Sequence, residues 1–140
     1  MRKITFILLP LIAVGLLSCK KNDDSTETIN FTSSEFKKFV LIKYDANKDL
    51  ELSIEEASAI KILNLSERHL GSVNGIEYFT NLTELDVFEN YLTELDVSKN
   101  TKLIYLNCES NPDLPILTMK KGQHISNIEK DDHTEIVRIN

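Results

Sequence analysis

The sequence has only two cysteines, Cys19 and Cys108, among its 140 residues. If Cys19 is chemically modified, no intramolecular disulfide can form, and the fold must be held together by packing. Basic residues are also few, because 16 Lys and Arg stand against 22 Asp and Glu, for a net charge of -6. This shortage of positive charge disfavours binding to nucleic acid and leaves no polybasic patch for anionic lipid.

A long apolar run occurs at the N-terminus, where Arg2 and Lys3 precede residues 4–17. The run is too short to span a bilayer with certainty and ends in Leu-Leu-Ser-Cys, so we interpret residues 1–18 as a cleaved export signal. Small residues before a cysteine resemble the bacterial lipobox, in which Cys19 is acylated and becomes the first mature residue. An ordinary signal peptide or an uncleaved anchor is the alternative. Loss of the two basic residues changes the net charge from -6 to -8.

Residues 19–30 are polar and lack a hydrophobic period, which predicts a flexible tether. Asp23 and Asp24 follow the cysteine closely and resemble the surface-export signals of Bacteroidetes lipoproteins, although an acidic linker is also simply a soluble linker. We therefore expect an outer-membrane lipoprotein of the cell envelope that is exposed on the surface. Its lipid would be its only link to the membrane.

Residues 31–59 predict a helix-loop-helix cap. A first helix is expected after Ser33 or Ser34, because three apolar side chains then share one face: Phe36, Phe39 and Val40. A second helix is expected after Ser53, which forms a capping-box spacing with Glu56.

The loop between these helices, residues 45–56, reads DANKDLELSIEE and matches the twelve-residue calcium loop of an EF-hand. Its expected oxygen ligands are Asp45, Asn47, Asp49, the carbonyl of Glu51, Ser53 and Glu56. Leu50 stands where glycine normally provides a positive φ, at a cost of roughly 1 kcal/mol. The alternative is a solvated turn beside a helix cap, and both can hold at once. We expect weak calcium binding, on the order of 0.1 to 1 mM, that braces the cap.

Residues 82–111 repeat the pattern L-x-x-L-x-[V/C]-x-x-N three times, which is typical of a stacked-coil solenoid. Leu63, Leu85 and Leu106 align at separations of 22 and 21 residues, so each separation is one full coil. Leu95 then lies about half a coil away, on the return side. We expect residues 60–140 to form about three coils, followed from Gly122 by a non-repeating cap that ends in an edge strand.

Three asparagines recur after the apolar pairs, at Asn90, Asn100 and Asn111. We expect their amides to bond backbone groups at the turns that no sheet ladder reaches. Cys108 occupies the position that Val87 and Val97 hold in the other blocks, which favours a small core residue over a nucleophile.

The histidines form a poor catalytic set, because His69, His124 and His133 are each alone in a predicted loop. Asp131, Asp132 and His133 are more typical of a hydrated loop than of a metal cluster. We therefore expect no enzyme activity.

Outward side chains of the predicted sheet form the candidate binding face, because they alternate with the inward Leu and Val. They mix carboxylates, amides and two aromatic rings, which suit a protein partner or a sugar, although a merely solvated sheet face is the alternative. The nine residues are Ile62, Asn64, Ser66, Glu84, Asp86, Phe88, Tyr105, Asn107 and Glu109.

The segments DANKDLELSIEEA, GIEYFTNL and LTELDVSKNTKLIYLNCESN together resemble leucine-rich-repeat lipoproteins of the Bacteroidetes, in which an EF-hand-like loop precedes the repeats. The resemblance covers roughly residues 31–111. It implies an α/β leucine-rich-repeat solenoid that is exported and has no catalytic residues to carry over. We expect a monomeric protein-protein interaction module, and a surface carbohydrate-binding or adhesion lipoprotein is the alternative.

Overall fold

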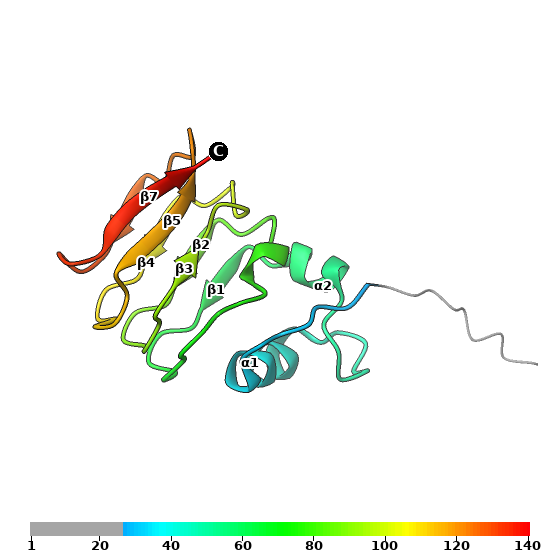
Figure 1. Ribbon diagram of the computed structural model, residues 1–140. Coiled ribbons are helices and arrows are strands. Elements are labelled where there is room, and N and C mark those ends of the chain that lie inside the picture. Colours follow the sequence, from blue (N-terminus) through cyan, green and yellow to red (C-terminus); the bar gives the residue numbers. More distant parts are fainter. Residues whose placement is uncertain (1–26) are drawn as a thin grey trace, which may run out of the picture.

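The computed structural model describes residues 27–140 (Figure 1). The predicted export signal, Cys19 and most of the predicted tether lie outside the described residues. Helix α1 (Ser34–Tyr44) begins after Ser33, whose hydroxyl accepts the Phe36 N–H, and helix α2 (Ile54–Ala59) begins after Ser53. Within residues 27–140, neither these helices nor any other combines the length and apolar character that a bilayer crossing requires.

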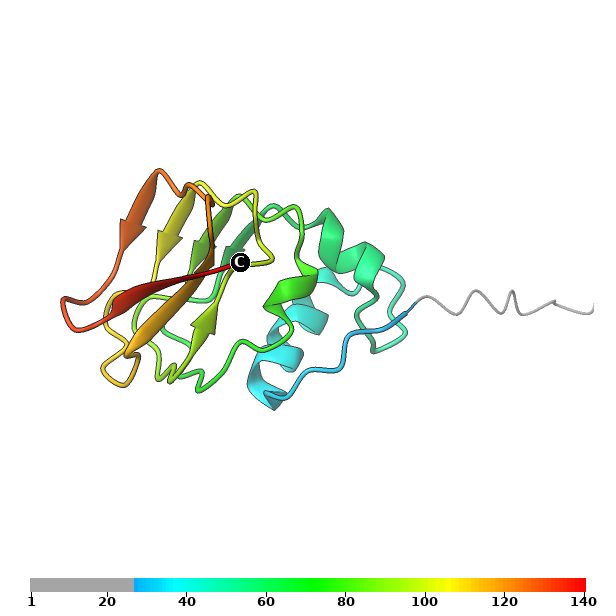
Figure 2. The same ribbon diagram turned by 45° about the horizontal axis from the view of Figure 1, so that its top comes forward.

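After α2 the chain winds into coils that build two parallel sheets on opposite sides of the molecule (Figures 1 and 2). The four-stranded sheet has the order β1 (Ile62–Asn64), β2 (Glu84–Asp86), β4 (Tyr105–Asn107), β6 (Asn127–Glu129). The three-stranded sheet has the order β3 (Leu95–Asp96), β5 (Ile116–Lys120), β7 (Glu135–Ile139). Coil one combines β1 with the short 3-10 helix η1 (Ile76–Tyr78), and coils two to four each contribute one strand to each sheet.

The register confirms the solenoid and its coil length. Leu63 pairs with Leu85, and Leu85 pairs with Leu106. The two copies of LTELDV lie on different sheets, because Leu85 is in β2 and Leu95 is in β3. The half-coil relationship read from the repeat spacing is therefore correct.

The expected number of coils is too low. Residues after Gly122 were expected to form a non-repeating cap, but Ile128 pairs with Leu106 and extends the four-stranded sheet by β6. β7 likewise pairs with β5, with Ile136 beside Leu117. The tail therefore forms a fourth coil, whose inward row is less regular than those of the preceding coils.

The core is the stack of inward apolar side chains between the two sheets. Leu63, Leu85 and Leu106 are fully buried, as are the Val87 and Cys108 side chains. Each such aliphatic side chain contributes about 1.5–3 kcal/mol when it is removed from water. Because a single coil cannot cover its own row, the coils stabilise one another.

Helix α1 closes the N-terminal end of this core. The Phe36 ring is fully buried, with its centroid 6.0 Å from that of Phe79 in coil one and 5.3 Å from that of Phe31. Phe31 in turn packs against Gly75, where a Cβ atom would lie only 2.8 Å from the ring. The aromatic cluster therefore joins α1 to the first coil.

The last residues of the predicted tether belong to the fold. Thr28 forms an antiparallel bridge with Ser53, and Ile29 is only 5% exposed. The Ile29 N–H donates to the Leu52 carbonyl, and the Ile54 N–H donates to the Glu27 carbonyl. The polar composition of residues 19–30 did not predict this pairing. One buried isoleucine and two backbone hydrogen bonds hold the segment, and neither produces a hydrophobic period.

Asparagine amides bond backbone groups at the turns, as the repeat pattern predicted, and the structure adds that they are buried and connect successive coils. Asn90 accepts the Leu70 N–H and donates to the Leu65 and Val87 carbonyls. One coil later, Asn111 accepts the Leu92 N–H.

On the return side, Asn100 donates to the carbonyls of Ile76 and Phe79. Gln123 does the same one coil later, with bonds to the carbonyls of Val97 and Asn100. The Oδ1 atom of Asn100 is the single buried side-chain polar atom without a hydrogen-bond partner in the part of the chain that is described.

Candidate functional site

The outer surface of the four-stranded sheet brings all nine predicted binding residues together. Ile62, Glu84 and Tyr105 stand side by side in one row across β1, β2 and β4, and Asn64, Asp86 and Asn107 form the next row. Ser66, Phe88 and Glu109 follow the strand ends. β6 adds Asn127 to the first row and Glu129 to the second. We call these eleven residues the strand face.

The reading of the sequence missed Asn127 and Glu129, although a signal for them existed. Ile128 lies 22 residues after Leu106, which is one coil length. The surrounding residues lack the Leu-x-x-Leu pattern of the preceding coils, so the segment did not stand out as a repeat.

Polar side chains of the strand face contact one another across the strands. The Asn64 amide donates to the Asp86 carboxylate at 3.2 Å, and the Tyr105 hydroxyl lies 3.4 Å from Glu129 Oε2. Burial raises the pKa of the Tyr105 hydroxyl above its ordinary value, and the negative charge of Glu129 raises it further. The phenol therefore stays protonated and is available as a hydrogen-bond donor.

Three residues of the strand face also terminate their strands. Asn64, Asp86 and Asn107 each accept the backbone N–H two residues later, at 3.1, 3.0 and 3.1 Å. Asp96 does the same at the end of β3. These Asx turns explain why Asn or Asp recurs at this position without any ligand. Their side chains are held in fixed positions, which also favours recognition of a partner.

The strand face is acidic and partly apolar. It carries four carboxylates, from Glu84, Asp86, Glu109 and Glu129, and none of its eleven residues is Lys or Arg. Ile62 is 57% exposed at the edge near the helices. There it borders a hollow of about 390 Å³ whose lining includes Tyr44, Glu56 and Ile60. The arrangement suits a positively charged surface with an apolar contact beside it.

The loop 45–56 folds around its own acidic side chains. Asp45 accepts the N–H groups of Lys48 at 2.7 Å and Leu50 at 3.0 Å. Asn47 accepts the Asp49 N–H, and Asp49 accepts the Glu51 N–H. Leu50 takes a positive φ of 68°, which is the conformation that the EF-hand pattern requires at this position. The leucine therefore bears the strain without preventing the turn.

Glu56 joins the two ends of this loop. Its Oε1 atom accepts the Ala46 N–H, and its Oε2 atom accepts the Ser53 N–H, completing a capping box. Partial burial opposes ionisation, but the hydrogen bonds from Ser53 and Ala46 lower the pKa of the Glu56 carboxyl overall. Across residues 27–140, no three His, Cys, Asp or Glu side chains are grouped so as to hold a metal ion.

Comparison with known proteins shows a likeness in fold. No family model matches the sequence, and no curated protein matches it. A solved structure of CBM51-2 in complex with GlcNAc and INT domains from Clostridium perfringens ZmpB matches with a TM-score of 0.53 and 22% sequence identity. The match covers 69% of this chain and 19% of that chain. At this identity it supports the solenoid architecture alone.

Cys108, Asp131 and His69 each have surroundings that fit a structural role. Cys108 is fully buried, and burial, together with the charge of Asp131, raises the pKa of its thiol to about 12. Asp131 accepts the N–H groups of Ser110 and Asn111, so its carboxylate caps the turn of the preceding coil. The His69 ring stacks on Tyr91 with centroids 5.6 Å apart.

Proposed function

We propose that the chain is an exported, lipid-anchored leucine-rich-repeat protein whose strand face binds a basic surface of a protein partner. The observation that carries the proposal is the charge of the strand face, which combines four carboxylates with Tyr105, Phe88 and an exposed Ile62. Protein recognition surfaces are enriched in aromatic side chains, and a surface potential opposite in sign to that of the partner speeds association and gives specificity. We propose that this role is binding and not catalysis. The burial of Cys108 supports this, because a buried thiol is not accessible as a nucleophile.

The membrane anchor and the location on the outer membrane rest on the sequence around Cys19. Metabolic labelling with an alkyne fatty acid should mark the wild-type protein and leave Cys19→Ser unmarked. Protease added to intact cells should remove the protein if it lies on the outer surface. Survival of the protein under this treatment, together with its loss after cell lysis, would place it on the periplasmic side.

The binding test uses the mature chain as bait against the surface proteins of the same cells. Glu84→Gln combined with Glu129→Gln should weaken capture of a specific basic partner about tenfold, and higher salt should weaken wild-type capture. Glu67→Gln with Glu89→Gln is the matched control, because it removes the same charge from exposed turns outside the strand face. Equal loss of binding in both double variants would refute recognition by the strand face.

Carbohydrate binding is the second candidate. Phe88 and Tyr105 are partly exposed aromatic side chains of the kind that stack on sugar rings, and the solved structure of similar fold contains GlcNAc. Glycan-array signals that disappear in Phe88→Ala and Tyr105→Ala would favour this function. Capture of a protein partner that is insensitive to added sugars would favour the first.

We also propose that the loop 45–56 binds calcium weakly and stiffens the helical end of the molecule. The support is the loop backbone, in which Leu50 already has a positive φ and donates its N–H to Asp45. Leu50→Gly should strengthen binding by relieving strain, and Glu56→Gln should weaken it. No heat of binding and no rise in melting temperature at about 5 mM calcium would exclude the site, because extracellular modules bind in the range of 0.1–1 mM.

A further inference from the structure

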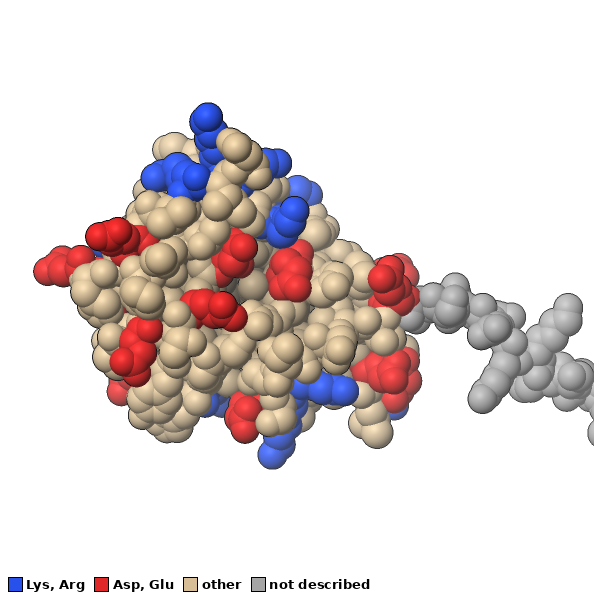
Figure 3. All heavy atoms as spheres, viewed as in Figure 1, with Lys and Arg blue, Asp and Glu red and all other residues tan. Residues whose placement is uncertain are grey.

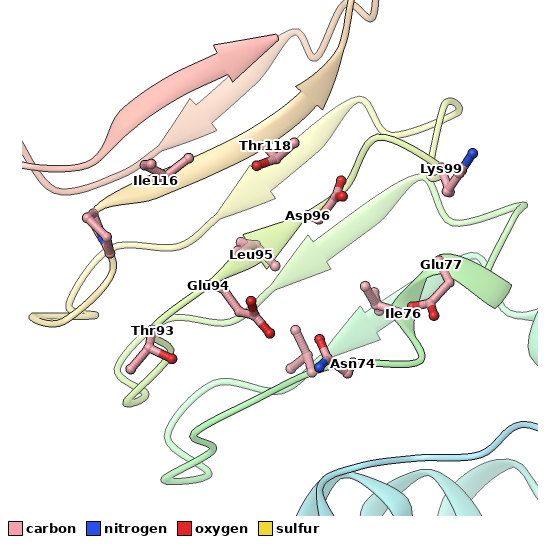
Figure 4. A pocket seen from close by; sticks show the side chains of 12 residues that line it. Asn74, Ile76, Glu77, Thr93, Glu94, Leu95, Asp96, Lys99, Ile116 and Thr118 are labelled. Atoms are coloured by element: carbon pink, nitrogen blue, oxygen red, sulfur yellow. The ribbon is translucent and has the colours of Figure 1, made fainter. Parts of the chain in front are cut away.

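A second hollow lies on the return side of the solenoid, away from the strand face. It has a volume of about 580 Å³ and opens between coil one and the three-stranded sheet (Figure 4). It exists because coil one forms no return strand. At Asn74 the chain turns through Gly75, which has a φ of 107°, and enters η1. The missing strand leaves a gap beside β3.

The edge of β3 that borders this hollow is unpaired. β3 is an outer strand of its sheet, and the Val97 N–H donates to Thr118 in β5 on the other side. In a parallel ladder the backbone groups of alternate residues point to opposite sides. The N–H and C=O groups of Asp96 therefore point towards the hollow, and the same alternation carried one step beyond the strand places those of Glu94 on that side. Among residues 27–140, no backbone hydrogen bond joins either residue to coil one.

The walls of the hollow are acidic and its floor is apolar. Glu77, Glu94 and Asp96 line it against a single basic residue, Lys99. Val73, Ile76 and Leu95 are buried beneath them. Glu94, which directly precedes β3, extends towards Asn74 on the opposite wall (Figure 4). In this view of the molecule, acidic side chains are spread across the middle, and basic side chains lie towards the top and the bottom (Figure 3).

We propose that this hollow binds an extended peptide segment rich in Lys or Arg, which pairs with the free edge of β3 as an added strand. Backbone bonds to Glu94 and Asp96 would provide affinity, and the three carboxylates would select positive side chains. A short free strand edge enclosed by charged walls suits one added strand better than the approach of a whole sheet. This site is separate from the strand face, so the two can bind at the same time.

The probe is a fluorescent nine-residue peptide in which lysine alternates with threonine. Fluorescence anisotropy with the mature chain should show saturable binding that weakens as salt rises. Glu94→Gln combined with Asp96→Asn should weaken peptide binding about five- to tenfold, as expected for the loss of two exposed charge pairs. Asp96→Asn keeps the oxygen that accepts the Ser98 N–H, so the end of β3 is preserved.

Two controls separate strand addition from simple charge attraction. The same peptide with N-methyl groups on alternate amides keeps its charge but cannot complete the strand pairing, so its binding should be lost. Glu67→Gln with Glu89→Gln should leave peptide binding unchanged.

Amide chemical shifts should move at residues 93–97 on peptide addition. Absence of binding, equal binding of the N-methylated peptide, or shifts confined to the strand face would each overturn the proposal. Displacement of the peptide from the hollow by a neutral oligosaccharide would identify a sugar site and would overturn it as well.

Discussion

The side-chain amide of Asn111 donates to the backbone carbonyl of Val87 at 3.0 Å, and the same carbonyl accepts the amide of Asn90 at 2.9 Å. Val87 belongs to coil two, whereas Asn111 belongs to coil three. One carbonyl therefore accepts a hydrogen bond from the turn of its own coil and another from the next coil. Because Asn90 and Asn111 are buried, water cannot replace these bonds when a side chain is removed.

Asn111→Ala should lower the free energy of unfolding by about 2–4 kcal/mol, because several buried backbone groups would lose their partner. Urea denaturation followed by circular dichroism measures the effect. Asn127→Ala is the control, since Asn127 is exposed and its amide contacts only the side chain of Glu129. A loss of similar size in both variants would contradict the stabilising role of the buried asparagines.

Gly75→Ala should destabilise the protein by about 1–3 kcal/mol. The residue has a φ of 107°, and an added Cβ would lie 2.8 Å from the Phe31 ring. Gly71→Ala is a matched control, because nothing lies within 4 Å of its Cβ position and the change should be about 0.5 kcal/mol or less. Thermal melts of the two variants should therefore differ clearly, and equal melting temperatures would refute the contact.

Cys108 should resist aromatic disulfide reagents in the native protein and react fully after denaturation. A Cys19→Ala background leaves it as the only thiol, given two cysteines in the sequence. Its pKa is raised from about 9 to about 12, so the unfolded chain releases the thiol proton first as pH rises. Its contribution to stability is therefore complete below pH 9 and is lost between about pH 9 and 12. Rapid labelling of folded protein would contradict this.

Glu129→Gln should lower the pKa of Tyr105, because it removes a nearby negative charge that disfavours the phenolate. Burial should still keep the pKa of Tyr105 above the ordinary value for tyrosine. Titration of the tyrosine ring carbons by NMR distinguishes Tyr105 from the other three tyrosines. Glu67→Gln should leave the titration unchanged. An unchanged pKa in Glu129→Gln would show that β6 does not lie beside β4.

The predicted features that depend on local spacing agree with the structure. Leu63, Leu85 and Leu106 align in neighbouring strands because a fixed repeat length places equivalent residues above one another. Asn90 and Asn111 bond backbone carbonyls at the turns as predicted, since each turn needs the same hydrogen bonds. The nine outward residues follow from strand alternation.

The features that sequence reasoning missed depend on irregular coils. Ile128 and Ile136 complete a fourth coil, but their surroundings do not repeat the earlier pattern. Ile29 joins the fold from a segment whose composition is that of a linker. In each case one or two apolar side chains and a few backbone hydrogen bonds hold the segment in the fold. So few apolar residues do not produce a recognisable hydrophobic period in the sequence.

The sequence alone determined the coil length, the inward apolar row and the turn asparagines, because these properties recur at a constant spacing. The tertiary structure decided how many coils stack and which strand edges stay free. The hollow beside β3 arises because Asn74 and Gly75 turn coil one away from the sheet, and its acidic walls come from different coils. Residues of different coils become neighbours only when the coils stack, so the sequence of one repeat does not reveal which residues will meet.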